Sequence, residues 1–322
     1  MTWMVTGGAG YIGAHVVREM IRAGIPVVVF DNLTTGVRSF VPEDVPLVEA
    51  DLLDTDSLRG ALSAHSVRGV IHIAGFKFAG ESVKRPVHTY SQNVTAMLSL
   101  LSAMEDLEID NVVFSSSSSV YGNAASGLVT EEHPLNPTSP YGESKVIGEW
   151  MLRNQGNSRP LTHTSLRYFN VVGSGDECLP DVSPHNLFSM VFESLERGKA
   201  PTIFGNDYDT PDGTCVRDYI HVSDLARAHV SAALRIEKGL NINNAYNLGT
   251  GNGTSVFEMM EAIARVTEIS FSPKIGPRRA GDPARVVASG QLAAQDIDWR
   301  TTYSLDDMIQ SAFDARKNVP SR

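Results

Sequence analysis

The chain has 322 residues, 42% of them apolar and 20% charged, which suits one large or two modest globular domains. Its formal net charge of −10 argues against nucleic acid or an anionic membrane as a partner. No apolar run reaches the length of a membrane span, and only two cysteines, Cys178 and Cys215, are present, so a disulfide framework is not expected. We therefore expect a cytoplasmic protein.

The N-terminal segment carries the first functional pattern. A strand expected at residues 2–6 runs directly into Gly7-Gly8-Ala9-Gly10-Tyr11-Ile12-Gly13, which opens a helix. This order is typical of dinucleotide binding, because the glycines let the backbone approach a pyrophosphate and the helix N-terminus favours its charge. A second strand ends at Asp31, whose carboxylate would accept both ribose hydroxyls of an adenosine and repel a 2′-phosphate. The pattern favours NAD over NADP.

Strands and helices alternate up to about residue 170. Further strands are expected at 46–50, 69–73, 111–114 and 161–166, and helices at 55–65, 86–107 and from about 141. This alternation predicts an α/β protein with a Rossmann-type doubly wound parallel sheet.

The second half of the chain follows another pattern. From about Val171 it is richer in Gly, Pro and Asp, with one clear helix expected from about His185 to Arg197 and another at 256–266. We predict a cofactor domain at 1–170, with a returning segment near 219–249. Residues 171–322 are then mainly a smaller C-terminal α/β substrate domain.

A tyrosine and a lysine follow a break in the chain at 136–140. Tyr141 and Lys145 are four residues apart, so on a helix they share one face. A phenol titrates near 10, and an ammonium group on the same face, with a cationic nicotinamide ring nearby, would favour the phenolate. Lowering the pKa by roughly three units takes about 4 kcal/mol. By itself the spacing more often marks a surface tyrosine beside a solvated lysine.

Five consecutive serines, Ser115 to Ser119, follow the strand at 111–114. Their composition is that of a linker. Their position, directly after a buried strand and before Val120-Tyr121-Gly122, places hydroxyl groups at the mouth of the cofactor cleft instead.

Taken together, the glycine turn, the serine run and the Tyr141/Lys145 pair resemble the extended short-chain dehydrogenase/reductases. Segments elsewhere narrow the resemblance to the UDP-glucose 4-epimerase family. These segments are Gly75-Phe76-Lys77 with Gly80-Glu81-Ser82, 166–170, 205–208, 212–222 and Arg278-Arg279-Ala280-Gly281-Asp282. The likeness covers essentially the whole chain. It implies a seven-stranded parallel Rossmann domain, tightly held NAD and a homodimer formed through a helix bundle.

The resemblance also implies a reaction and catalytic roles. UDP-glucose and UDP-galactose would interconvert through a transient 4-keto sugar, the hydride passing to the nicotinamide and returning to the other face of the sugar. Tyr141 would remove the proton of the 4-hydroxyl. Ser117 would bond the sugar oxygen and relay the proton, while Lys145 would hold the nicotinamide ribose and lower the pKa of the tyrosine.

Contacts to both ligands follow from the same likeness, and no metal site is expected. The cofactor residues would be Gly7, Gly10, Tyr11, Ile12, Gly13, Asp31, Asn32, Asp51, Leu52, Ile73, Ala74, Gly75, Lys77, Asn93, Ser115, Tyr141, Lys145, Tyr168 and Phe169. The substrate residues would be Lys77, Ser117, Tyr141, Asn170, Asn186, Leu187, Thr202, Phe204, Arg217, Arg279, Asp282 and Val286. Arginines suit a diphosphate because guanidinium forks match phosphate oxygens.

Val286 bears on which sugars fit. In the resembling family a side chain a few residues after the Gly-Asp pair lies beside the 2-substituent of the sugar, and counting on from Gly281-Asp282 lands on Val286, or by one residue on Arg285 or Val287. Valine leaves more room than a bulky aromatic, so we expect UDP-N-acetylglucosamine to be accepted as well as UDP-glucose. The alternative is that neighbouring residues fill the gap.

Two other functions are compatible with parts of the pattern. A nucleotide-sugar 4,6-dehydratase or a uronate decarboxylase would need an extra carboxylate after the catalytic hydroxyl, where this chain has Ser118 and Ser119. A non-catalytic NAD-sensing regulator would keep the glycine turn, but it would have no reason to retain Tyr141, Lys145 and a hydroxyl at Ser117.

Overall fold

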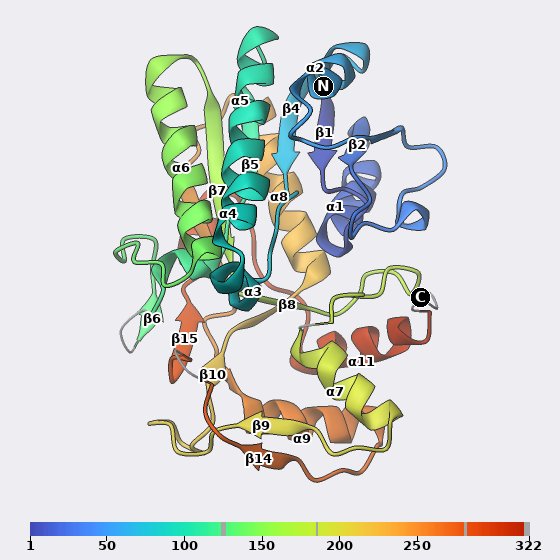
Figure 1. Ribbon diagram of the computed structural model, residues 1–322, viewed down its shortest axis with the longest axis vertical. Helices are drawn as coiled ribbons and strands as arrows, with labels where there is room; N and C mark the ends of the chain where they lie inside the picture. The colour runs from blue at the N-terminus through green and yellow to red at the C-terminus, as the bar shows by residue number, and fades with distance from the viewer. Residues whose placement is uncertain (124–126, 185, 280–281, 319–322) are drawn as a thin grey trace.

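A computed structural model describes residues 1–123, 127–184, 186–279 and 282–318. Two parts are visible in Figure 1: a sheet covered by helices, and a smaller part facing the ends toward which the strand arrows point. Among the residues described, no helix is both long and apolar enough to cross a membrane. His185, Ala280 and Gly281, which the sequence patterns include, lie outside the described residues.

The main sheet has seven strands in the order β12-β7-β5-β4-β1-β2-β3. Every neighbouring pair in it is parallel. The strands are β1 (Thr2–Thr6), β2 (Val27–Asp31), β3 (Leu47–Glu49), β4 (Val67–His72), β5 (Asn111–Ser115), β7 (Thr162–Tyr168) and β12 (Ala245–Leu248). This arrangement confirms the Rossmann-type doubly wound sheet.

Alternating side chains of the strands build a core on each face of the sheet. Trp3 and Val5 belong to one hydrophobic cluster, which includes residues of α1 (Tyr11–Arg22) and α8 (Val222–Glu237). Met4, between them, belongs to a second cluster with residues of α2 (Thr55–Ala64) and α5 (Ala96–Asp106). Helices cover both faces of this sheet, so the side chains on both faces of a strand are buried. For this reason the strand segments are continuous apolar runs in the sequence.

The helix expected at 86–107 is present but not uniform. It consists of α4 (Pro86–Tyr90), a π-helical turn (Ser91–Thr95) and α5. The π turn contains Asn93, a residue expected at the cofactor site, and single π turns inside helices occur frequently at functional sites.

The returning segment expected near 219–249 supplies α8 and β12, which adds the seventh strand beside β7. The helix predicted near 185–197 is α7, and the one predicted at 256–266 is α9. The predicted domain boundary at residue 170 stays a prediction.

The remaining elements are α3 (Ala79–Lys84), β6 (Leu128–Val129), α6 (Pro140–Ser158), β8 (Asn170–Val172), α7 (Leu187–Glu196), β9 (Thr202–Phe204), β10 (Val216–Arg217), β11 (Tyr219–His221), β13 (Thr254–Ser255), α9 (Val256–Thr267), β14 (Lys274–Gly276), β15 (Arg285–Ala288), α10 (Gln291–Asp296) and α11 (Leu305–Arg316), together with short 3-10 turns at Arg38–Phe40 and Ser118–Tyr121.

Short strand pairs connect the smaller part to the sheet. β8 pairs with β11, and β10 pairs with β13 and β15, which in turn pairs with β6. A further pair, β9 with β14, lies farther from the main sheet (Figure 1). The carboxyl ends of the main strands face the smaller part (Figure 1). The candidate active site described below lies at these ends.

Candidate active site

The glycine-rich turn after β1 can only be built from small residues. Gly7 has a φ of +73°, and a Cβ on Gly13 would lie 2.0 Å from the carbonyl oxygen of Gly7. Gly10 is the N-cap of α1 and provides no side-chain hydrogen bond to the first N–H groups of the helix. A close backbone turn with uncapped N–H groups at a helix start fits a dinucleotide pyrophosphate.

Asp31 is the last residue of β2, the strand next to β1. Its two carboxylate oxygens accept the N–H groups of Ala9, at 3.0 Å, and Leu33, at 2.9 Å. Burial raises the pKa of the carboxyl group, and these hydrogen bonds lower it. Nearby, the Asn32 side chain donates to Asp51 at 2.9 Å. Asp31, Asn32 and Asp51, three of the expected cofactor residues, thus lie close together at the carboxyl edge of the sheet.

Asn93 holds the loop that follows β4. Its Oδ1 accepts the N–H of Phe76 at 2.7 Å, and its Nδ2 donates to the Phe76 carbonyl at 3.0 Å and to Ser144 Oγ at 2.8 Å. Both amide hydrogens are therefore committed within the protein. Asn93 acts here by positioning the loop of Gly75 and Lys77 against α6.

Helix α6 begins with two strong local signals and carries the central residues. Ser139 caps it by accepting the N–H of Gly142 at 3.2 Å, and Pro140 occupies the first turn. Tyr141 and Lys145 follow four residues apart and are only 8% and 5% exposed. They are buried, which excludes the surface-pair interpretation of their spacing.

The ammonium group of Lys145 lies under the end of β5. Its Nζ donates to the carbonyl oxygen of Ser115 at 2.7 Å and lies 5.8 Å from the ring centre of Tyr141. Burial lowers the pKa of Lys145 to about 8, while the negative charge of Glu149 acts in the opposite direction. The lysine is thus placed to change its protonation near neutral pH.

The pKa of Tyr141 does not follow the sequence-based expectation. Burial raises it above 10, and a hydrogen bond with the Ser117 side chain opposes this rise. The expected lowering by Lys145 is not seen, because burial disfavours the phenolate and weakens the lysine charge as well. The protein does bring Ser117, Tyr141 and Lys145 together.

The serine run is part of the core, so the linker interpretation is wrong. Ser115 and Ser116 are fully buried, and Ser117 is 7% exposed. The Ser115 hydroxyl hydrogen-bonds to His229 of α8 at 2.6 Å, and Ser117 caps the 3-10 turn that follows by accepting the N–H of Ser119 at 3.2 Å. The hydroxyl groups of Ser115 and Ser117 are therefore fixed by contacts with different elements.

A buried ionic network next to this triad was not identified from the sequence. Glu149 accepts the Ser116 hydroxyl at 2.5 Å and two donors of Arg167, at 2.9 and 2.5 Å. Arg167 also donates to the hydroxyl of Tyr121 at 2.8 Å, which donates to Asn247 at 2.7 Å. A signal was available, since Glu149 lies four residues after Lys145 and so continues the helix face of Tyr141.

The predicted substrate residues fall into separate groups on the smaller part. Arg217 of β10 donates to the Pro283 carbonyl at 2.8 Å, lies 3.7 Å from Asp282 and pairs in register with Val286. The guanidinium of Arg279 lies 4.1 Å from the ring centre of Phe204. Asn170 begins β8, Leu187 begins α7 directly after Asn186, and Thr202 begins β9. Tyr168 is the last residue of β7, and Phe169 lies between it and Asn170.

Comparison with known proteins identifies the family. Residues 3–249 match the model of the NAD dependent epimerase/dehydratase family. The chain belongs to this family. It is 39% identical to a UDP-glucose 4-epimerase of Lactobacillus helveticus, over 99% of this chain and 98% of that protein. These findings confirm the resemblance and the enzyme class expected from the sequence.

Two solved structures illustrate how far the likeness extends. The structure of UDP-glucose 4-epimerase from Brucella ovis in complex with NAD has a TM-score of 0.92, with 39% identity and 98% of both chains covered. The UDP-Glc/GlcNAc 4-epimerase of Campylobacter jejuni has a TM-score of 0.87, with 32% identity and 99% of both chains covered. The similarity therefore includes the smaller part as well as the sheet.

The Lys145 environment predicts an observable titration. In NMR spectra of labelled lysine side chains, Lys145 should titrate near 8, the value to which burial lowers its pKa. Glu149→Gln removes the negative charge that favours the ammonium, so the midpoint should move below 8. The exposed Glu132→Gln should leave it unchanged. A midpoint near 10, or the same midpoint in Glu149→Gln, would contradict this electrostatic description.

Proposed function

We propose that this protein is an NAD-dependent 4-epimerase that interconverts UDP-glucose and UDP-galactose through a transient 4-keto sugar. The proposal rests on one observation: the buried side chains of Ser117, Tyr141 and Lys145 lie close together at the carboxyl edge of a dinucleotide-binding sheet. The names of its relatives support it. Because the substrate and product have the same oxidation state, the protein must keep its cofactor throughout the reaction.

The chain's own groups divide the work. Tyr141 exchanges the proton of the sugar 4-hydroxyl, and Ser117, whose side chain lowers the pKa of the phenol, holds the sugar oxygen and relays that proton. Lys145 is placed to hold the nicotinamide ribose, with its Nζ 5.8 Å from the ring centre of Tyr141. NAD, when bound, supplies the hydride acceptor and a positive charge that offsets the effect of burial on Tyr141.

Arg217 and Arg279 are assigned to the diphosphate and the uridine side of the substrate, together with Phe204 and Asp282. Both arginines have aromatic or main-chain partners, but the ion pair of Arg217 is loose at 3.7 Å. Such an arginine can turn to a phosphate without leaving a tightly bound carboxylate unpaired. The remaining substrate assignments are Lys77, Asn170, Asn186, Leu187 and Thr202.

The buried network supports epimerisation over the dehydratase or decarboxylase alternatives. Those reactions need a free carboxylate beside the catalytic hydroxyl. Ser119 stands there and its side chain hydrogen-bonds to Ser117 at 3.2 Å, while the Glu149 carboxylate is occupied by Ser116 and Arg167. An NAD-sensing regulator would not need a buried Tyr141.

A homodimer and a cytoplasmic location complete the proposal. Val87 of α4, Leu98 of α5 and Trp150 of α6 are 81%, 56% and 47% exposed, which supports a helix-bundle interface over these helices. Cys178 and Cys215 are both free, as expected in a reducing compartment.

Tyr141→Phe tests the catalytic assignment. It removes the proton-transferring hydroxyl and keeps the ring, so kcat should fall by roughly 10²–10⁴-fold while NAD remains bound. The measurement is interconversion of UDP-glucose and UDP-galactose, with NAD content determined after acid release. The exposed Tyr303→Phe, as a matched loss of a hydroxyl, should keep full activity. Near-full activity of Tyr141→Phe from neutral to alkaline pH would require another base.

The second prediction concerns the sugar range and rests on Val286. In β15, Arg285 is exposed and Val287 fully buried. Val286 packs against a hydrophobic cluster that includes Phe169 and Val120, and Val120 lies three residues after Ser117. We expect UDP-N-acetylglucosamine to be a substrate, as the name of the Campylobacter jejuni relative states for that protein.

In Val286→Tyr the added ring should reduce kcat/KM for the N-acetyl sugar by roughly tenfold or more and leave that for UDP-glucose nearly unchanged. The measurement is kcat/KM for both sugars in parent and variant. No turnover of the N-acetyl sugar by the parent, or equal turnover by both proteins, would show that Val286 does not set the sugar range.

A further inference from the structure

Asp218 is the single residue between β10 and β11, and its side chain is fully buried. Its Oδ1 accepts the N–H of Thr250 at 2.9 Å and the Thr250 hydroxyl at 2.6 Å. Its Oδ2 accepts the N–H groups of Ala288, at 3.1 Å, and Gly251, at 3.3 Å. A carboxylate can be buried only when such donors replace water. Here they come from the loop after β12 and from the end of β15.

The main chain of Asp218 is hydrogen-bonded to two of the expected substrate residues. Its N–H donates to the carbonyl oxygen of Val286 at 3.2 Å. Its carbonyl oxygen accepts the N–H of Asn170 at 3.1 Å and the side-chain amide of Asn170 at 2.9 Å. Arg217, the arginine assigned to the diphosphate, directly precedes it. The placement of Arg217, Asn170 and Val286 therefore depends on where the backbone of residue 218 lies.

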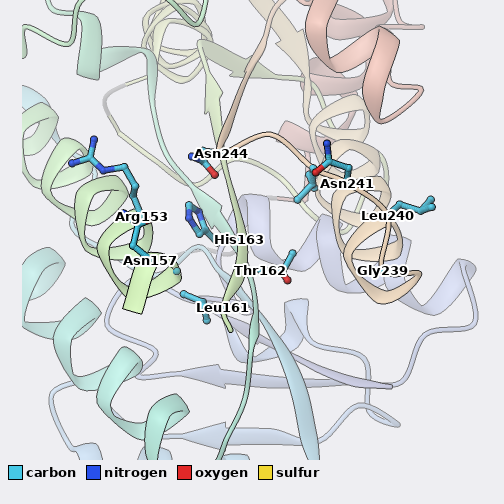
Figure 2. Close-up of a pocket in the computed structure, with 11 residues that line it drawn as sticks. Arg153, Asn157, Leu161, Thr162, His163, Gly239, Leu240, Asn241 and Asn244 are labelled. Atoms are coloured by element: carbon cyan, nitrogen blue, oxygen red, sulfur yellow. The ribbon is translucent and has the colours of Figure 1, made fainter. Parts of the chain in front are cut away.

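The loop that Asp218 holds belongs to the main sheet. It follows Leu248, the last residue of β12, whereas the other end of this strand begins after Asn244, beside the open hollow shown in Figure 2. Thr250 is thus at the carboxyl edge of the sheet, where ligands of parallel sheets bind. Gly249 permits the close approach, since a Cβ on it would lie 2.6 Å from Asp218 Oδ2.

The Arg217 side chain has no tight carboxylate partner that would fix it independently. Its Nη1 donates to the carbonyl oxygens of Val216, at 3.0 Å, and Pro283, at 2.8 Å. Its ion pair with Asp282 is loose, at 3.7 Å. Because main-chain groups of β10 and of the segment before β15 hold the guanidinium, its position follows that of these two backbones.

We propose that Asp218 is a positioning residue for substrate binding. By accepting donors from the main sheet and from β15, it fixes Arg217, Asn170 and Val286 relative to the catalytic edge. Its buried carboxylate is occupied by protein groups, so it acts through these residues and not on the substrate itself. This inference rests on the proposed function, because it assigns these residues to a UDP-sugar.

Asp224 of α8 provides a matched comparison. It is also fully buried, and its carboxylate accepts the N–H of Thr302 at 3.0 Å, the Thr302 hydroxyl at 3.0 Å and the N–H of Tyr303 at 3.3 Å, and it pairs with Arg227. These partners include none of the expected substrate residues. Asp224 and Asp218 therefore share a type of hydrogen bonding but hold different parts of the chain.

The test is the Asp218→Asn variant of the full chain. The amide NH₂ cannot accept a hydrogen bond, so one pair of donors loses its partner and β10 must shift. KM for UDP-galactose, and Kd for UDP by isothermal titration calorimetry, should each rise by about tenfold or more, the effect of losing one charged hydrogen bond from Arg217. The value of kcat and the NAD content should stay close to those of the parent, because other contacts hold Tyr141 and Lys145.

The matched variant Asp224→Asn should lower the melting temperature and leave KM and Kd unchanged. A milder pair removes one hydroxyl donor from each carboxylate. Thr250→Val should raise KM and Kd about threefold, whereas Thr302→Val should not change them. This pair decides the question where either asparagine variant does not fold.

The outcomes separate this inference from the proposed function. A parent that neither binds UDP nor converts UDP-galactose would overturn the proposed function, and the role of Asp218 with it. With an active parent, unchanged KM and Kd in Asp218→Asn would overturn the positioning role alone. An equal rise in Asp224→Asn would do the same, and so would a fall in kcat without a rise in KM.

Discussion

The buried ammonium group of Lys145 is the constraint on which the centre of the molecule depends. A charge so far from water is stable only with partners, and the structure provides the carbonyl oxygen of Ser115 and the carboxylate of Glu149. These partners come from the end of β5 and the next turn of α6. Satisfying one lysine therefore fixes the helix against the strand, and with it the distance between Tyr141 and the serine run.

Glu149 extends this constraint beyond the helix. Its carboxylate is shared by Ser116 and Arg167, and Arg167 continues through Tyr121 to Asn247 on β12. The network joins α6, β7, β12 and the turn that follows Ser117. The catalytic hydroxyl is thus held by elements that are far apart in the sequence. Removing one partner of such a pair is strongly destabilising, because the other charge remains buried.

Local patterns predicted what depends on local physics. The glycine turn, the strand ending in Asp31 and the Tyr141/Lys145 pair follow from sterics and helical spacing, and the structure brings them to one edge of the sheet. The pKa of Tyr141 could not be predicted, because it depends on burial by distant segments. Arg167 gave no sign of its partner, since a charge on a strand does not indicate what faces it.

The smaller part was harder to predict for a different reason. Its strands β10, β13 and β6 are two residues long, too short to show an alternating pattern. The helix α11 was not predicted, although it begins with a capping box at Ser304 and Asp307, which is a recognisable helix-start signal.

The buried Tyr141 and Lys145 are proposed to serve a reaction in which the hydride returns to the sugar it came from. The most direct test uses purified, extensively dialysed protein and UDP-galactose carrying deuterium at C4, with no nucleotide added. We predict that UDP-glucose forms with deuterium retained at C4, and that no ketone accumulates. Turnover that requires added cofactor, or product that has lost its deuterium, would contradict the account.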